Sequence, residues 1–363
     1  MKHKFFIIFA LLLIINFSKS FVDPSYYSKL LGKVRKNIVE QSLLSLPKRN
    51  VVNYLQMFNQ IAYSKEKYSL TNADSAYLIY KWIATNIVFE PGEVNQDPVE
   101  VYNSGKGTSY GISSLFKKMC NYLSLESNII SGYFKTGKTD NLENIIIKID
   151  FTWNSILIDN TNYLIDISNG AGVFDLDENE FIPLYTDFYF GTNPEFFIRD
   201  HFPKDSRWQL LSEPYSLEKF ESQAYLTYFF YLKGFKNISP DVSEISGSGQ
   251  SKIVLDYDKS ITDLEVTSLT IDFINDDIID FNEVIVSNGK IEVKFNLEYD
   301  KIVYLVIIVN EPSIIGGLVN ISFYKLNSLT KLSSFLNIKK EDIKHSKAKK
   351  TLNNILKKNI LKK

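Results

Sequence analysis

The chain has little cysteine and little histidine: its 363 residues include one cysteine and three histidines. The single cysteine, Cys120, excludes an intrachain disulfide, so packing alone must hold the fold together. Of the histidines, His3 and His345 lie near the two ends, which leaves only His201 as a general base of the usual kind in the body of the chain. A histidine-rich metal site is excluded, and no zinc, calcium or dinucleotide signature occurs. We expect neither a metal nor a cofactor.

Long apolar runs are also scarce, and the one that occurs lies at the N-terminus. It extends from Phe5 to Ile15 after a basic start, and Ser18-Lys19-Ser20 places small residues where a signal peptidase cleaves. A bilayer-spanning helix needs roughly 20 apolar residues, so this run is too short to span comfortably. We predict that residues 1–20 are a secretory signal and that the mature protein is extracellular. An uncleaved membrane anchor is the alternative.

The charge is small overall, −1, but it is unevenly distributed. Residues 330–363 contain eleven lysines against two acidic residues, a net charge of +9. The apolar residues Leu352, Ile355, Leu356 and Ile360 lie at helical spacing within this segment. The pattern predicts a basic amphipathic tail that contacts an acidic partner or a membrane surface. A solvated tail without a partner is the alternative, and no nucleic acid partner is expected.

The period of the apolar residues indicates an α+β domain in the first part of the chain. Residues 25–90 are typical of helices, and Asp97-Pro98 begins another short helix. A glycine-rich turn at 105–111 precedes a predicted helix over 113–125. The period then changes to two, and Asp159-Asn160 marks a hairpin turn. The predicted strands are 128–134, 145–150, 153–158 and 163–167.

The remainder of the chain alternates in the manner of an all-β domain. Predicted strands occur at 252–255, 265–273, 283–286, 290–297, 302–308 and 319–324. Their spacing, with the Asn288-Gly289 turn between two of them, predicts an immunoglobulin-like β-sandwich over residues 245–329. The glycine- and serine-rich stretch 245–250 reads as a loop or linker that follows a first domain over residues 21–225.

Three short segments occur in an informative order. They are Gly107-Thr108-Ser109-Tyr110-Gly111, Phe151-Thr152-Trp153-Asn154 and Tyr163-Leu164-Ile165-Asp166. They resemble the transglutaminase-like superfamily, and within it the kyphoscoliosis-peptidase group, whose segments are Gly-x-Cys-x-Gly-Tyr, His-Ala-Trp-Asn and Trp-Tyr-Leu-Ile-Asp. Segments 81–87, 132–135, 201–203 and 208–211 are similar to that group as well. The resemblance covers roughly residues 75–220 and implies a papain-like α+β domain.

The resemblance also implies a Cys-His-Asp site, and this chain keeps only one of its three residues. In such a site a thiolate at a helix N-terminus attacks a carbonyl, an imidazole holds the proton, and a carboxylate orients the imidazole. The nucleophile position is Ser109, the base position is Phe151, and the orienting acid is Asp166. A phenyl ring accepts no proton, so a serine hydroxyl there has no base.

Two residues could be considered as replacements. Cys120 lies eleven residues beyond Ser109 on the same predicted helix, about 16 Å away along its axis, and is expected to be a buried core residue. His201 could act as a base, but it matches a non-catalytic segment, so a structural role is expected. Without an imidazole to orient, Asp166 is expected to be partly exposed or bonded to a tyrosine hydroxyl or a backbone N–H.

These observations predict a secreted, catalytically inactive transglutaminase-like protein that binds a peptide or protein partner. Residues that could contact a ligand in the former cleft are Tyr110, Trp153 and Asn154, although the last two are more typical of scaffold. An active hydrolase, peptidase or acyl transferase with an unusual base is one alternative, and a structural surface or matrix protein is another. Asn237 and Asn320 begin glycosylation sequons.

Overall fold

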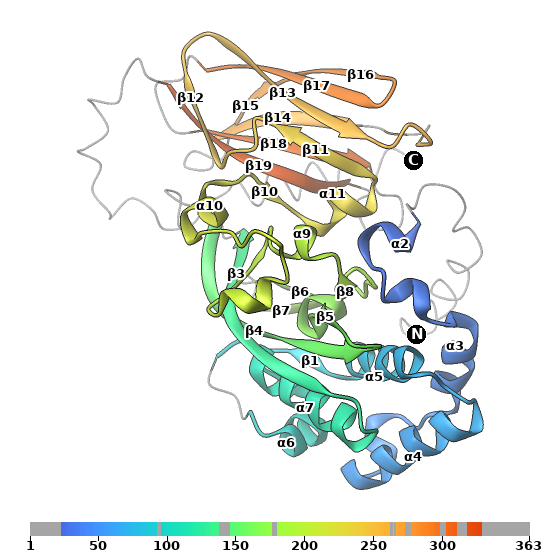
Figure 1. The fold of residues 1–363 in the computed structure, drawn as a ribbon. Helices are drawn as coiled ribbons and strands as arrows, with labels where there is room; N and C mark the ends of the chain where they lie inside the picture. Colours follow the sequence, from blue (N-terminus) through green and yellow to red (C-terminus); the bar gives the residue numbers. More distant parts are fainter. Residues whose placement is uncertain are drawn as a thin grey trace, which may run out of the picture.

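The computed structural model describes residues 23–92, 96–137, 146–175, 180–261, 264, 266–272, 277–297, 303–310 and 318–328. The predicted signal (1–20) and basic tail (330–363) lie outside these residues. Figure 1 shows helices and a curved sheet in one half of the molecule and two β-sheets in the other. Among the described helices, none is long and apolar enough to cross a membrane.

Helices form the base of the first half, around one nearly encased helix. Helix α5 (Asn72–Asn86) begins at a capping box in which Thr71 and Asp74 bond each other's backbone N–H groups. It contacts α3 on one side and α7 on the other. The helices of this half are α2 (Pro24–Tyr27), α3 (Lys36–Ser45), α4 (Tyr54–Lys67), α6 (Pro98–Ser104) and α7 (Ser109–Tyr122), with the 3₁₀ turns η1 (Leu31–Lys33) and η2 (Arg49–Val51).

An antiparallel sheet covers these helices, and helix α7 packs against its two longest strands (Figure 1). The order of the described strands is β8-β5-β4-β3-β9. Their bounds are β3 (Ser127–Gly137), β4 (Ile146–Ile158), β5 (Thr161–Ile165), β8 (Phe190–Thr192) and β9 (His201–Pro203). Asp159 and Asn160 join β4 to β5 with φ of 50° and 57°, as a two-residue hairpin turn of this hand requires. That predicted turn is confirmed.

Two boundaries predicted in this domain are wrong. The separate strands predicted at 145–150 and 153–158 are one strand, β4, because Phe151 and Thr152 pair with β3 without interruption. The helix predicted from residue 113 begins four residues earlier, because Thr108 caps it by accepting a hydrogen bond from the Gly111 N–H.

Short elements complete the first half and lead into the second. They are β1 (Val88–Phe89), β2 (Lys106–Gly107), α8 (Ile167–Ala171), β6 (Gly172–Asp175), β7 (Glu180–Pro183), α9 (Pro194–Phe197), η3 (Ser206–Gln209), α10 (Leu217–Ser222) and α11 (Tyr228–Leu232). Helices α9, α10 and α11 lie between the two halves (Figure 1).

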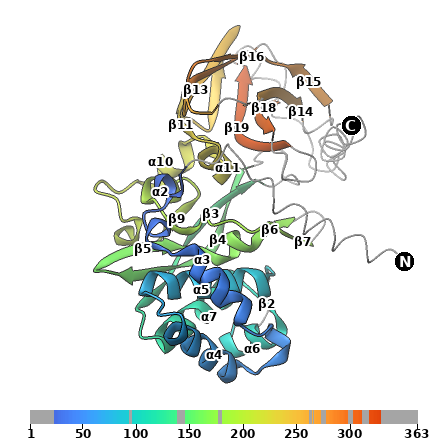
Figure 2. The same cartoon turned by 90° about the vertical axis from the view of Figure 1, so that its right-hand side faces the viewer.

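The second half is a sandwich of two sheets, and Figure 2 shows one sheet packed against the other. One sheet has the order β11-β13-β17-β16, and the other runs β19-β18-β14-β15 with β10 and β12 beside β19. By position in the chain these orders correspond to strands A-B-E-D and G-F-C-C′ of an immunoglobulin fold. The predicted α+β domain followed by an immunoglobulin-like sandwich is therefore confirmed.

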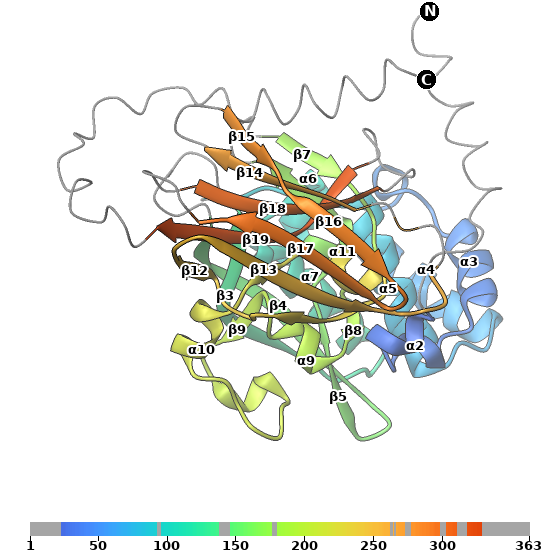
Figure 3. The same ribbon diagram turned by 90° about the horizontal axis from the view of Figure 1, so that it is seen from above.

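The strand bounds and burial explain the packing of the sandwich. Its strands are β10 (Tyr225–Leu226), β11 (Phe235–Ser239), β12 (Glu244–Gly247), β13 (Gln250–Tyr257), β14 (Val266–Asp272), β15 (Asp277–Phe281), β16 (Glu283–Ser287), β17 (Lys290–Asn296), β18 (Val303–Asn310) and β19 (Leu318–Ser328). Alternate residues of β13 and β17 are buried, as a half-buried strand requires. Seen from above, the sandwich strands extend across the first domain (Figure 3).

The linker predicted at 245–250 is wrong, and so is the start of the sandwich at residue 245. Residues 244–247 form β12, which pairs in parallel with β19, and β13 begins at Gln250. Strands β10 and β11 already belong to the two sheets, so the sandwich begins at Tyr225. The glycine and serine content resembles a linker, but Ile245 is buried and the backbone pairs with a distant strand.

We predict that Gly132→Ala destabilises the protein strongly. Gly132 lies in β3 between β4 and β9, and a Cβ there would lie 2.3 Å from both the Phe202 carbonyl oxygen and Trp153 Cη2. Overpacking of this kind costs about 3 kcal/mol in the free energy of unfolding. Urea denaturation measures it. The matched control is Gly32→Ala, where the nearest atom would be 3.9 Å away, and equal losses in both variants would contradict the assigned packing.

Candidate functional site

Ser109, at the nucleophile position, is the first residue of helix α7. Strands β1 and β2 fix the turn before it, and the Thr108 side chain caps the helix. Ser109 is buried, and its hydroxyl forms no hydrogen bond with any described residue. The helix N-terminus would favour a negative charge there, but within the described residues no base lies within hydrogen-bonding distance of the hydroxyl.

Phe151, at the base position, is enclosed by other aromatic rings. It lies in β4 opposite Gly132 and is 5% exposed. Its ring centroid lies 5.1 Å from that of Phe134 and 5.7 Å from that of Phe89, and Phe89 also contacts Phe174. Offset and edge-on ring contacts of this kind stabilise a core. The position that an imidazole would occupy is therefore part of an aromatic cluster, which we call the Phe151 cluster.

Asp166, the acid position, is buried and well supplied with donors. It is the N-cap of α8 and accepts hydrogen bonds from the backbone N–H of Asn169, at 3.2 Å, and from the Asn169 side-chain amide, at 2.5 Å. The predicted backbone donor is thus present. The prediction that Asp166 has no imidazole partner is wrong, because His201 Nε2 lies 2.9 Å from Asp166 Oδ2.

His201 is held between two carboxylates. Its Nδ1 atom lies 2.6 Å from Asp200 Oδ1, and the Tyr189 hydroxyl donates to the other oxygen of Asp200 at 2.9 Å. The imidazole also stacks on Phe197, with the ring centroids 4.0 Å apart. Burial by itself would lower the pKa of His201, but the charge of Asp200 and the hydrogen bonds to Asp166 and Asp200 outweigh it and raise the pKa to about 9.

At neutral pH His201 is therefore an imidazolium whose two N–H groups both donate to carboxylates. A protonated imidazole accepts no further proton, so it is not a general base for Ser109. The structural role expected for His201 agrees with this geometry. We call Asp166, His201 and Asp200 the buried charge network.

Trp153 and Asn154 do not reach the surface, so the alternative that they contact a ligand in a cleft is wrong for both. Trp153 is 1% exposed and Asn154 is fully buried. The Asn154 amide donates to the Ser113 carbonyl at 3.1 Å, which joins β4 to helix α7. Tyr110 is 44% exposed and remains available on the surface beside Ser109.

The other candidate residues lie where they cannot take part in chemistry at Ser109. Cys120 is buried in α7, and burial raises the pKa of its thiol well above the ordinary value. In the described part of the chain, no three histidine, cysteine, aspartate or glutamate side chains lie together as a metal site. Asn237 is exposed on β11, as a glycosylation site requires, and the side chain of Asn320 lies outside the described residues.

The contact that sequence reasoning missed is the one between His201 and Asp166. The two residues are 35 positions apart: Asp166 follows β5, and His201 begins β9, which is not a neighbour of β5 in the sheet. The available signal was the presence of a single histidine in the body of the chain next to an aspartate, Asp200. That pattern indicates a buried imidazolium only if the segment is buried, which the sequence does not specify.

Comparison with known proteins gives the same assignment as the geometry. The model of the transglutaminase-like superfamily matches residues 59–166, which include α5, Ser109, Phe151 and Asp166. The chain carries a transglutaminase-like domain. This domain continues past the matched range through β9, where His201 completes the buried charge network.

Curated relatives match about half of the chain. Kyphoscoliosis peptidase from Homo sapiens is 30% identical over 181 residues, which are 48% of this chain and 27% of that protein. The Mus musculus protein of the same name is 30% identical over 49% of this chain and 28% of its own length. Lim and transglutaminase domain protein ltd-1 from Caenorhabditis elegans is 27% identical over 49% of this chain and 27% of its own length. The chain thus spans about a quarter of the length of these relatives.

We predict that the charge on His201 makes the transglutaminase-like domain less stable at alkaline pH. The folded pKa of about 9 lies above the ordinary value of 6.5, so the contribution is fully present below pH 6.5 and is lost as the pH rises through 9. The total is roughly 3 kcal/mol. Chemical denaturation at several pH values measures it, and His201→Gln should remove this dependence.

The difference between the wild-type and His201→Gln profiles isolates the imidazole. Lys135, whose pKa burial and the charge of Arg199 lower to about 8, titrates in the same range but is present in both proteins. Parallel profiles between pH 6 and 10 would show that His201 carries no charge in the folded state.

Proposed function

We propose that this protein is a non-catalytic member of the transglutaminase-like superfamily that acts by binding a peptide or protein segment. The main support is that both ring nitrogens of His201 are hydrogen-bonded to carboxylates, those of Asp200 and Asp166. A serine hydroxyl is a poor nucleophile unless a base removes its proton. Ser109 has no hydrogen-bond partner in the described residues, so nothing there performs that step.

The part of the fold that surrounds Ser109 supports a binding role. Helix α7, strands β3 to β5 and the capping carboxylate Asp166 keep the arrangement that the family uses to present a nucleophile. Two of the relatives are named peptidases, which makes a polypeptide the ligand class to test first. An active enzyme with an unusual base would need a proton acceptor beside Ser109, and no described side chain occupies that place.

Secretion and attachment through the tail complete the proposal. The apolar run at 5–15 followed by Ser18-Lys19-Ser20 supports export, and the excess of lysine in residues 330–363 supports contact with an acidic partner or membrane surface. Expression in a secreting eukaryotic cell, with the protein sought in the medium and its N-terminus sequenced, tests the first of these.

Purified protein should not turn over acyl or peptide substrates. Incubation with a casein-derived peptide pool, with and without a fluorescent primary amine, should release no product and incorporate no amine above the level of Ser109→Ala. Mass spectrometry of the reaction mixtures measures both outcomes. Turnover by the wild type that Ser109→Ala abolishes would overturn the non-catalytic proposal.

Restoring the two replaced residues should restore thiol reactivity. A free cysteine is only a few per cent thiolate at pH 7, whereas a neighbouring imidazole lowers its pKa and makes most of it thiolate, a gain of about tenfold or more in alkylation rate. We expect Ser109→Cys with Phe151→His to react with iodoacetamide at least that much faster than Ser109→Cys alone. The wild type supplies the background, because its only cysteine, Cys120, is buried. Equal rates in the two variants would show that positions 109 and 151 do not face each other.

A further inference from the structure

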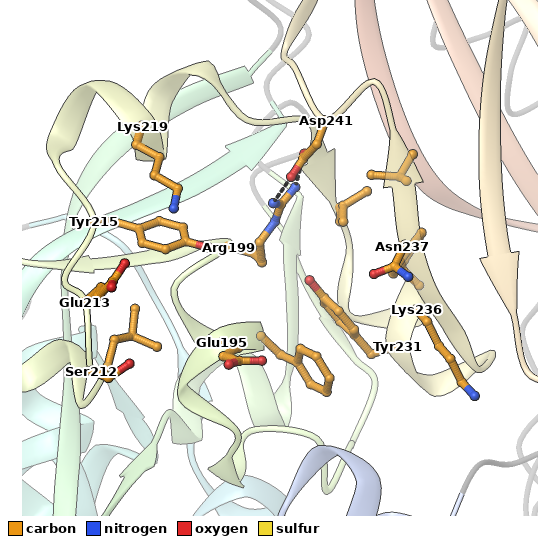
Figure 4. A pocket seen from close by; sticks show the side chains of 15 residues that line it. Glu195, Arg199, Ser212, Glu213, Tyr215, Lys219, Tyr231, Lys236, Asn237 and Asp241 are labelled. Carbon is orange, nitrogen blue, oxygen red and sulfur yellow. Dashed lines mark hydrogen bonds and ion pairs between the residues drawn. The ribbon is translucent and has the colours of Figure 1, made fainter.

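A pocket between the two domains has the features of a built ligand site. Its volume is about 450 Å³, within the range of small-ligand and peptide side-chain sites. The transglutaminase-like side contributes α9 and the segment from Leu211 to Lys219, and the sandwich side contributes α11 and β11. Figure 4 shows Glu213 and Glu195 across the pocket from Asn237. It lies away from Ser109, which is not among its lining residues.

The wall formed by β11 is an edge strand, and the Tyr26 hydroxyl, which donates to the Phe235 carbonyl at 3.3 Å, bonds only the start of it. Strand β11 is the outermost strand of its sheet, and among the described strands it pairs only with β13. Asn237 and Ile238 both line the pocket, although successive side chains of a regularly paired strand point to opposite faces, and Lys236 lines it from the irregularity that precedes them. The pocket therefore meets β11 along its edge. An exposed edge of this kind is where an extended peptide can add a strand through main-chain hydrogen bonds.

A tyrosine hydroxyl without a hydrogen-bond partner among the described residues faces the same space. Tyr231 is 4% exposed, its ring stacks on Phe196 at 4.3 Å, and its hydroxyl makes no hydrogen bond with a described residue. In Figure 4 this hydroxyl points into the pocket. The ring is buried and held in place while the hydroxyl is open to the pocket, so a ligand there can supply its hydrogen-bond partner.

The unneutralised charge of the pocket is negative. Arg199 is held by Asp241 through two hydrogen bonds of 2.7 and 2.8 Å. Lys236 pairs with Asp258 at 2.9 Å.

The remaining charged groups of the lining are Glu195, Glu213 and Lys219. The two carboxylates have no ion-pair partner among the described residues. The Lys219 ammonium lies over the Tyr215 ring, 3.5 Å from its centroid, which shows that the ring accepts a cation. The charges of Glu195, Glu213 and Lys219 sum to −1, so one further positive charge would neutralise the pocket.

We propose that this pocket binds an extended peptide, which adds a strand to the free edge of β11 and places a lysine or arginine side chain against Glu195 and Glu213. The main chain of the peptide supplies affinity, the two carboxylates select the basic side chain, and the Tyr231 hydroxyl gains a hydrogen-bond partner. This inference rests on the proposed binding function and names its site and ligand class.

Degenerate nonapeptide pools test the site with the full-length protein. Each fluorescein-labelled pool has one fixed central residue, and fluorescence polarisation measures binding. The lysine and arginine pools should bind about tenfold more tightly than the glutamate pool, since the fixed charge is reversed. Glu195→Gln with Glu213→Gln should weaken the lysine pool about fivefold, as the loss of two solvent-exposed ion pairs implies. Tyr231→Phe should weaken all pools.

Matched controls separate the site from general electrostatics. Glu66→Gln with Glu126→Gln removes the same charge from exposed positions outside the pocket and should leave binding within about twofold. N-methylation of alternate residues in the best-binding peptide should abolish binding, because it removes main-chain donors. N-acetyl-lysine methylamide, which carries the charge but no strand, should bind far more weakly.

Several outcomes would overturn the inference. These are pools that bind equally whatever their central charge, a loss in the Glu66 and Glu126 control equal to that in the pocket variant, or binding of the small amine as tight as that of the peptide. None of these results involves turnover, so they would remove the peptide site and leave the non-catalytic proposal standing. Thermal unfolding of each variant confirms that it is folded.

Discussion

A buried imidazolium between two carboxylates is the interaction on which the transglutaminase-like domain depends. Asp166 follows β5 and caps α8, whereas His201 begins β9 at an edge of the sheet and Asp200 precedes it. Removing such charges from water costs several kcal/mol for each group unless they are paired with good geometry. The buried charge network meets that condition, and in doing so it fixes β9 and the aromatic residues around it in one arrangement.

The same packing determines which groups lie near Ser109. An imidazole locked at both nitrogens is unavailable as a base, and the Phe151 cluster fills the position where a second imidazole would stand. The rings exclude water, which strengthens the ionic hydrogen bonds beside them. The packing that stabilises the domain therefore also leaves Ser109, at the N-terminus of α7, without a base among the described residues.

The junction between the two domains contains the pocket that supports the proposed binding role. Strands β10 and β11 follow the transglutaminase-like domain without a long linker, so the sandwich begins against α9 and α11. The Arg199–Asp241 pair joins α9 to the segment after β11. Because β11 is the last strand of its sheet, its outer edge pairs with no described strand and lies beside Glu195 and Glu213. The proposed peptide site and Ser109 thus lie in different places in the molecule.

Local sequence determined several features of this protein. The serine at position 109, the phenylalanine at position 151, the turn at Asp159-Asn160 and the alternation of the sandwich strands depend on residue type and near neighbours. Only the tertiary structure decided the contact of His201 with Asp166, the single strand through Phe151, and the strand at 244–247 where the composition resembles a linker. Each of these features depends on a residue or strand that is distant in the sequence. A strand forms only where another strand pairs with it, and a charged group is buried only where a partner of opposite charge contacts it. Residue type alone does not specify that partner.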